Sequence, residues 1–132
     1  MSVVIETKTV SKIYQSGSVD VKAVDEASFQ IQAGEFVGLV GPSGSGKTTM
    51  LAMLAALLVP TLGDVILDGT NLGSMDEAAR VKFSREKIGF TFQSNNLVPF
   101  LTVRENVELK LRLNEQFDSK SAKRSEDLLV RL

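Results

Sequence analysis

The chain has 132 residues, of which 43% are hydrophobic and 23% charged, and its formal net charge is −1. This length suits one domain with one core, and the near-neutral charge argues against a nucleic-acid partner held by overall positive charge. The absence of cysteine excludes disulfides and thiolate metal sites. No basic start with an apolar stretch marks a signal peptide, and the longest apolar run, Met50 to Val59, is too short to span a bilayer. We therefore expect a soluble, cytosolic protein with no nucleic-acid partner.

Two extended stretches come first in the chain. Val3 to Tyr14 is rich in Val, Ile and Thr and predicts a strand, and Val19 to Gln32 predicts a second one. In the second stretch, Ser28 to Gln32 alternates polar and apolar residues, as expected when one face is buried. A short polar turn joins the two stretches, which predicts a small antiparallel layer beside the main sheet.

The next segment matches the phosphate-binding P-loop pattern G-x-x-x-x-G-K-[ST]. Before it, Phe36 to Val40 predicts a strand buried on both faces of a parallel sheet. After it, Thr48 to Val59 predicts a buried helix that Pro60 ends. The order of strand, loop and helix predicts a nucleotide site. The pattern occupies Gly41, Pro42, Ser43, Gly44, Ser45, Gly46, Lys47 and Thr48.

Each position of this loop suits phosphate chemistry. Glycines let the backbone curl so that successive N–H groups point inward at phosphate oxygens. The following helix directs the positive end of its dipole at the same oxygens. Lys47 adds a positive charge for the β- and γ-phosphates, and Thr48 supplies a hydroxyl for Mg²⁺.

A short strand and an exposed helix are predicted next. Asp64 to Gly69 is a strand that ends in an Asp-Gly turn. Asp68 could alternatively be a second Mg²⁺ ligand at a strand end, but the short apolar run before it and the glycine after it favour a structural turn. Ser74 to Lys87 predicts a helix, with Ser74 and Glu77 as a capping box.

In the last third of the chain, the sequence predicts one more strand and further helices. Ile88 to Phe92 predicts a strand that ends at Gln93, followed by a loop from Ser94 to Leu101. Thr102 and Glu105 predict a capping box at the start of the next helix.

Together these segments resemble the ATP-binding subunits of ABC transporters, from about Val3 to Leu132. The resemblance implies an α/β fold: a P-loop NTPase (RecA-like) core with a small antiparallel β layer, of the ABC ATPase type. Within the family the chain is most similar to the lipoprotein-releasing and macrolide-exporter group, although Thr91 stands where an aliphatic residue is usual. Besides the P-loop, the matching strings are Gly34-Glu35, Pro60 to Gly63, Ile88 to Gln93 and Leu101 to Val107.

The resemblance assigns roles to single residues. The P-loop, extended to Thr49, would bind the phosphates of ATP, with Thr48 on Mg²⁺. Tyr14 would stack on adenine, although a Tyr at a strand end can also be merely packed. Gln93 would be a catalytic residue that contacts Mg²⁺ or the attacking water, unless it is a plain surface amide. The loop from Ser94 to Leu101 would face the integral-membrane subunit, unless its apolar side chains close the core.

Later motifs of the family are absent from the sequence. It contains no Leu-Ser-Gly-Gly-Gln signature, no apolar strand ending in Asp-Glu and no histidine. It also ends within the helix that Ser119 to Leu132 predicts. We therefore interpret residues 1–132 as the N-terminal part of a single ABC ATP-binding domain, truncated before the signature motif, with the P-loop at 41–49 and the Q-loop at about 93–101.

This interpretation separates the chain from its parent protein. The parent would be an ATPase that pairs with a second ATP-binding subunit as a homodimer on the inner face of the cell membrane. The chain itself would bind Mg-ATP at most and would not be catalytic alone.

Three alternatives stay open. The first is an ABC-type ATPase of cell division, repair or translation, and the second is a short, non-hydrolysing nucleotide-binding module. The third is a small P-loop kinase, for which the segment from Gly89 to Gln93 gives no support. Near-neutral charge and the exporter-like strings favour transport.

Overall fold

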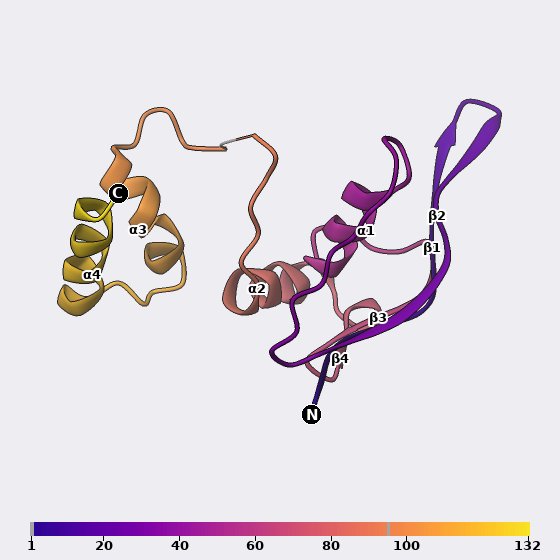
Figure 1. The fold of residues 1–132 in the computed structure, drawn as a ribbon, viewed down its shortest axis with the longest axis horizontal. Coiled ribbons are helices and arrows are strands. Elements are labelled where there is room, and N and C mark those ends of the chain that lie inside the picture. Colours follow the sequence, from indigo (N-terminus) through magenta and orange to yellow (C-terminus); the bar gives the residue numbers. More distant parts are fainter. Residues whose placement is uncertain (1, 95) are drawn as a thin grey trace. The chain divides into compact units, whose positions relative to one another are not determined.

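The computed structural model describes residues 2–94 and 96–132. The chain forms two compact units, Met1–Ser84 and Arg85–Leu132, and each is described by itself (Figure 1). In the part of the chain that the structure describes, no helix combines the length and the apolar character that crossing a membrane requires.

The first unit is built on a four-stranded antiparallel sheet with the order β2-β1-β3-β4 (Figure 1). Strand β1 (Val3–Ser16) and strand β2 (Val19–Gln32) form a long hairpin. Strand β3 (Leu62–Leu67) pairs with the other edge of β1, and the short β4 (Thr70–Asn71) follows it. The predicted antiparallel layer is confirmed.

Two irregular positions interrupt the hairpin, one on each strand. Thr9 on β1 and Glu26 on β2 both have a positive φ of 46°, where the register of the pair shifts. The Thr9 N–H donates to Ser28 Oγ at 2.8 Å, and the Glu26 N–H donates to Ser11 Oγ at 2.9 Å. Each bulge therefore keeps its amide paired through a serine of the opposite strand, at the place where the hairpin bends.

The core of the first unit lies between the sheet and helix α1 (Lys47–Leu54). Val10 of β1, Val65 of β3 and Met53 of α1 are fully buried, at 0% exposure. Met50 is also buried, while Leu51 on the other side of the helix is 45% exposed. The methionines therefore serve as core residues, and α1 is buried on one face rather than all round.

Helix α1 ends earlier than the sequence predicts. It stops at Leu54 instead of Val59, and Ala56 takes a positive φ of 58°. The N–H groups of Leu57 and Leu58 both donate to the Ala52 carbonyl, at 3.0 and 3.2 Å. These bonds satisfy the last turn before Pro60 can act as the breaker.

Two predicted strands are absent. Phe36 to Val40 has no regular structure, and Phe36 and Val40 are 102% and 91% exposed. Ile88 to Phe92 likewise forms no strand. The rings of Phe90 and Phe92 pack edge to face, with their centroids 4.7 Å apart. A buried parallel strand exists only between neighbouring strands, and among the described residues none pairs with either segment.

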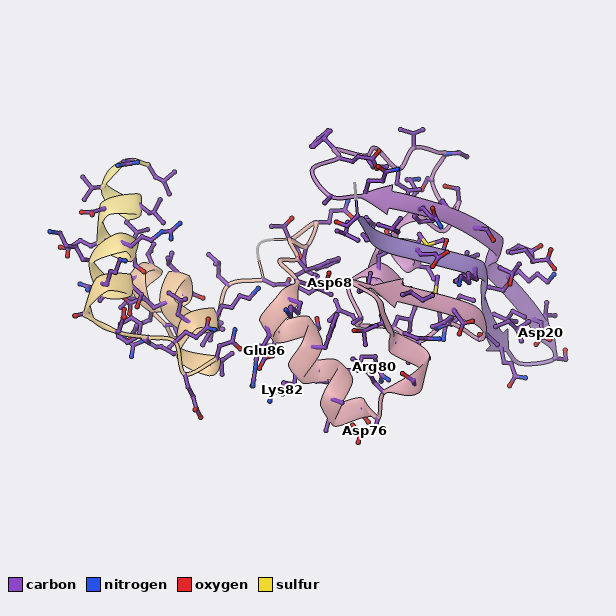
Figure 2. The ribbon with its side chains drawn as sticks, turned by 90° about the horizontal axis from the view of Figure 1, so that it is seen from below. Asp20, Asp68, Asp76, Arg80, Lys82 and Glu86 are labelled. Atoms are coloured by element: carbon purple, nitrogen blue, oxygen red, sulfur yellow. The ribbon has the colours of Figure 1, made fainter. Side chains whose placement is uncertain are left out.

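The segment after β3 contains the predicted turn. Asp68 and Gly69 take positive φ values of 48° and 76° between β3 and β4, so Asp68 is a turn residue, as Figure 2 shows. The 3₁₀ helix η1 (Leu72–Ser74) follows and buries Leu72.

The predicted capping box at Ser74 and Glu77 is wrong. Helix α2 (Glu77–Lys87) starts after Asp76, whose carboxylate accepts from the Ala79 N–H at 2.8 Å (Figure 2). Ser74 instead donates its hydroxyl to the Asn71 carbonyl at 2.7 Å. Aspartate is as good an N-cap as serine, so the residue nearer to the helix takes the role.

The second unit packs helix α3 (Val103–Leu113) on helix α4 (Ser119–Val130). The predicted capping box of Thr102 and Glu105 is confirmed, since each side chain bonds to the other residue's backbone N–H. A second box, Asp118 with Ser121, starts α4.

A buried carboxylate lies on α3. Glu108 is 1% exposed and accepts from Arg104 Nε at 2.9 Å and from Arg112 at 2.7 Å. The two hydrogen bonds and the charges of these arginines lower the pKa of Glu108, and they outweigh the opposing effect of burial. The bridge places each arginine one turn of α3 away from the carboxylate.

Substitution at Gly63 tests the packing of β3 on β1. Gly63 has a φ of +78°, and a Cβ there would overlap the carbonyls of Lys8 and Thr9. Gly69 has a similar φ of +76° but nothing within 4 Å of an added Cβ. We expect Gly63→Ala to lower the free energy of unfolding by more than about 2 kcal/mol and Gly69→Ala by about 1 kcal/mol. Urea unfolding followed by circular dichroism measures both, and equal losses would contradict the backbone overlap.

Acid should weaken the second unit through Glu108. Because its folded pKa is lowered, its contribution is complete above the unfolded value of about 4.5 and is lost as pH falls through the lower folded value. We expect Glu108→Gln to lower the thermal midpoint at neutral pH, and the difference from the unsubstituted chain to shrink below about pH 4.5. Glu115→Gln, at an exposed position, is the matched control and should change neither the thermal midpoint at neutral pH nor its dependence on pH. A difference that stays constant down to about pH 2.5 would refute the assignment.

Candidate functional site

The P-loop segment forms a tight loop that leads directly into α1. Gly44 and Gly46 take positive φ values of 79° and 87°, and Gly46 is the N-cap residue of the helix. The Ser45 N–H donates to the Pro42 carbonyl at 3.3 Å. Positive φ at these two positions costs glycine little and other residues more, so the glycine spacing of the pattern is a requirement of the backbone.

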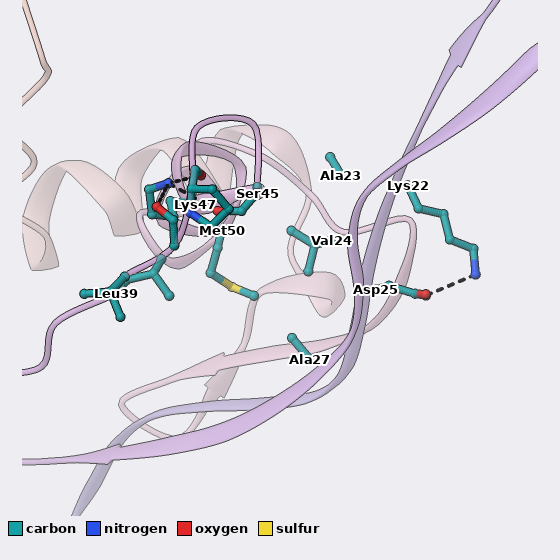
Figure 3. A pocket seen from close by; sticks show the side chains of 13 residues that line it. Lys22, Ala23, Val24, Asp25, Ala27, Leu39, Ser45, Lys47 and Met50 are labelled. Carbon is teal, nitrogen blue, oxygen red and sulfur yellow. Dashed lines mark hydrogen bonds and ion pairs between the residues drawn. The ribbon is translucent and has the colours of Figure 1, made fainter.

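Strand β2 backs this loop closely. A Cβ at Gly46 would overlap the carbonyl of Ala23 and would lie 3.4 Å from a methyl group of Val24. Across the loop, a Cβ at Gly41 would lie 2.7 Å from Ser45 Oγ. The N-terminus of α1 therefore reaches the hairpin because residue 46 has no side chain. Figure 3 shows Ser45 and Lys47 of this loop together with Ala23 and Val24 of β2.

Lys47 turns its ammonium group back over the loop. Its Nζ donates to the carbonyls of Gly41 at 2.8 Å and Pro42 at 2.6 Å, and to Ser45 Oγ at 3.2 Å (Figure 3). Three oxygens within hydrogen-bond reach fix the ammonium at the loop that the glycines shape. An ammonium group held in this way is suited to donate hydrogen bonds to the oxygens of a phosphate chain in place of the loop oxygens.

A cavity of about 480 Å³ opens beside the loop. One wall is the P-loop with Lys47, and the other is the stretch of β2 around Ala23 and Val24 (Figure 3). Lys22 and Asp25 form an ion pair of 3.1 Å on the hairpin side, which offsets one positive charge with one negative. Lys47 makes no such pair among the described residues, so it brings a net positive charge to the cavity.

The structure brings together part of the predicted set. Among the predicted site residues, Gly41, Pro42, Ser45, Gly46 and Lys47 line the cavity. The other four residues of the predicted P-loop are not among its lining residues, although they belong to the same loop and the first turn of α1: Ser43, Gly44, Thr48 and Thr49.

The β2 wall was not predicted as part of the site. Lys22, Ala23, Val24 and Asp25 carry no motif, and their sequence indicates only a strand. Their place follows from the close approach of the hairpin to Gly46, which is a tertiary contact.

Tyr14 lies on β1 opposite Val21 and is 42% exposed. Lys12 approaches the ring, with its Nζ 5.5 Å from the ring centroid, and it also donates to the Val59 carbonyl at 2.8 Å. Tyr14 is not among the residues that line the cavity. An open ring face is what stacking on a base requires, and that role stays a prediction.

Gln93 belongs to the second unit and is exposed in a stretch without helix or strand. Of the loop from Ser94 to Leu101, residue 95 lies outside the described residues. Leu97 and Phe100 of this loop are 62% and 86% exposed, so they do not close the core of their unit.

Comparison with known proteins indicates the family to which this chain belongs. The family model described as "ABC transporter" matches residues 24–132. Two relatives come from Methanocaldococcus jannaschii, and both are named uncharacterized ABC transporter ATP-binding proteins. MJ0796 is 45% identical over 81% of this chain, and MJ1508 is 44% identical over 95% of it. The chain spans about half the length of these relatives, 46% and 56% respectively.

A solved structure supports the same family. The ATP-binding cassette MJ0796, described as a dimer in a post-hydrolysis state bound to ADP and Pi, matches with a TM-score of 0.87 and 39% identity. The match covers 93% of this chain and 54% of that one. None of these names specifies a lipoprotein-releasing or macrolide-exporter group, so that assignment stays a prediction. The family model, the relatives and the shared fold show that the chain belongs to the ABC transporter family of ATP-binding proteins.

Proposed function

We propose that the chain binds Mg-ATP through its P-loop, and that residues 1–132 form the N-terminal part of a single ABC ATP-binding domain. The observation that carries the proposal is the glycine cradle held against β2, with the Lys47 ammonium fixed over it at 2.6 to 3.2 Å from three loop oxygens. A phosphate chain replaces those oxygens as partners of Lys47, and the backbone N–H groups at the start of α1 bind the remaining phosphate oxygens.

The loop also fits the metal that accompanies ATP. Thr48 stands in the first turn of α1, next to Lys47, and its side chain is exposed. Its hydroxyl would hold Mg²⁺, which binds hard oxygen ligands that come from the protein, from phosphates and from water. The bound ion would neutralise phosphate charge. Gln93 is the second residue we assign to Mg²⁺ or to the attacking water.

The whole protein, in this proposal, powers transport. It would act on the inner face of the cell membrane, with the loop from Ser94 to Leu101 against an integral-membrane subunit. A second ATP-binding subunit would complete the site, and the dimeric state described for the MJ0796 cassette supports this. The chain alone would bind nucleotide without hydrolysing it, because its sequence has no signature motif, no strand ending in Asp-Glu and no histidine.

Replacing Lys47 tests the phosphate site. Lys47→Ala should weaken ATP binding by about 10- to 100-fold, because charge-assisted hydrogen bonds to phosphate are worth about 1.5–3 kcal/mol. Titration of a fluorescent ATP analogue in the presence of Mg²⁺ measures this. Lys8→Ala is the control, since Lys8 is exposed on β1 and pairs only with Glu6 among the described residues. Unchanged affinity in a folded Lys47→Ala chain would remove the P-loop assignment.

Replacing Tyr14 separates the base from the phosphates. Tyr14→Ala should weaken binding of ATP by about 1–3 kcal/mol, the usual worth of stacking between a base and an aromatic ring. Inorganic triphosphate has no base, so its binding should stay unchanged. Tyr14→Phe keeps the ring and should retain the affinity for ATP. Calorimetric titration of both ligands decides the matter, and equal losses for the two would make Tyr14 a structural residue.

A further inference from the structure

A tight turn shapes the loop before α3. The Leu101 N–H donates to the Val98 carbonyl at 3.1 Å, which closes a four-residue turn over Val98, Pro99, Phe100 and Leu101. Proline at the second position fixes the backbone angle that such turns require there. Phe100, at the third position, is 86% exposed. The turn therefore holds a large apolar side chain in solvent.

One side chain, that of Asn106, holds both ends of this turn. The carboxamide oxygen of Asn106 accepts from the Val98 N–H at 2.8 Å, and its nitrogen donates to the Val98 carbonyl at 3.2 Å. The same nitrogen also donates to the carbonyls of Leu101 at 3.1 Å and Thr102 at 3.0 Å. The two hydrogen bonds between the Asn106 carboxamide and the Val98 backbone resemble those between two paired strands, with a side chain in place of one backbone.

These bonds are not needed to start α3. The helix already has a complete capping box, in which Thr102 and Glu105 satisfy each other's N–H groups. Asn106 follows in the first turn of the helix and is half-buried. Three of its four hydrogen bonds go to Val98 and Leu101, so their main effect falls on the loop, and the fourth goes to the N-cap residue Thr102.

The turn and its neighbours expose large apolar side chains. Leu97, Phe100 and Val103 are 62%, 86% and 68% exposed. The loop from Ser94 to Leu101 contains no Asp, Glu, Lys or Arg. A partner that pairs with it gains apolar burial rather than ion pairs. Holding the loop in one conformation before binding reduces the entropy that association costs.

We propose that Asn106 is a positioning residue: its carboxamide holds the turn of residues 98–101 so that Leu97 and Phe100 bind an apolar segment of the integral-membrane subunit. This inference rests on the proposed function of the loop as the contact with that subunit. It adds the residue that gives the loop its shape and the apolar chemistry of the contact.

Amide hydrogen exchange tests the positioning directly on this chain. Asn106→Asp keeps the size and one acceptor oxygen but turns the donating nitrogen into a second oxygen, which faces the carbonyls of Val98, Leu101 and Thr102. Exchange of the Leu101 amide, which donates to the Val98 carbonyl that the new oxygen repels, should become at least about tenfold faster. The Glu105 amide, which donates to Thr102, should keep its protection, because a negative charge near the start of α3 suits the helix dipole.

The matched control is Gln116→Glu. It makes the same change from amide to carboxylate at an exposed position after α3. It should leave exchange at Val98 and Leu101 unchanged. If Asn106→Asp also leaves the Leu101 amide protected, the carboxamide does not hold the turn and the proposal is overturned.

Photo-cross-linking tests the partner. Since the sequence has no cysteine, Asn96→Cys gives one site for a benzophenone maleimide at an exposed position next to Leu97 and leaves both proposed contact residues intact. In native membranes the labelled chain should cross-link to an integral-membrane protein, identified by mass spectrometry. Addition of Asn106→Asp should lower the yield at least about tenfold, while Gln116→Glu retains it and ATP binding stays equal in all three chains.

The two failures are distinguishable. Absence of any cross-link from the Asn96→Cys chain would refute the docking function of the loop. A cross-link that Asn106→Asp retains in full would refute the role of Asn106 alone. High salt should not reduce the yield, since the loop carries no charge, and a strong loss with salt would refute the apolar contact.

Discussion

The contact on which the nucleotide site depends is the approach of Gly46 to the Ala23 carbonyl. No other residue fits there, because a Cβ would overlap that oxygen and the backbone already has a φ of +87°. The contact places the start of α1 against the hairpin, and the cavity lies between them. The hairpin in turn is held by the pairing of β1 with β3. There a Cβ at Gly63 would overlap the carbonyl oxygens of Lys8 and Thr9, as a Cβ at Gly46 would overlap that of Ala23. Two glycines without side chains therefore set the geometry of the first unit.

Much of this was readable from the sequence, because the signals are local. The P-loop pattern indicates which backbone positions need glycine, and alternation in Ser28 to Gln32 indicates a half-buried strand. The capping box of Thr102 and Glu105 acts over three residues, and it formed as predicted. The β2 wall of the cavity could not be predicted, because nothing in Lys22 to Asp25 shows that this strand meets Gly46.

The wrong predictions share a physical cause. Phe36 to Val40 has the composition of a buried strand, yet strand structure exists only through pairing with another strand. Hydrogen bonds also decided two helix boundaries that the sequence did not predict. The Ala52 carbonyl accepts the bonds that end α1, and the Asp76 carboxylate accepts the bond that caps the start of α2. Composition states what a segment can form, and its hydrogen-bond partners decide what it forms.

Asn106 shows how a polar side chain can act where sequence rules see only a helix. Asparagine in the interior of a helix is neutral to unfavourable, because its side chain competes for backbone hydrogen bonds. Here that competition is directed outward from the first turn, to the N–H and carbonyl of Val98. The P-loop fixes a cation with the loop's own carbonyls, and the turn of residues 98–101 is fixed by a carboxamide. In both places one side chain is hydrogen-bonded to the carbonyls of an exposed loop, and in both that loop is the surface to which we assign a partner.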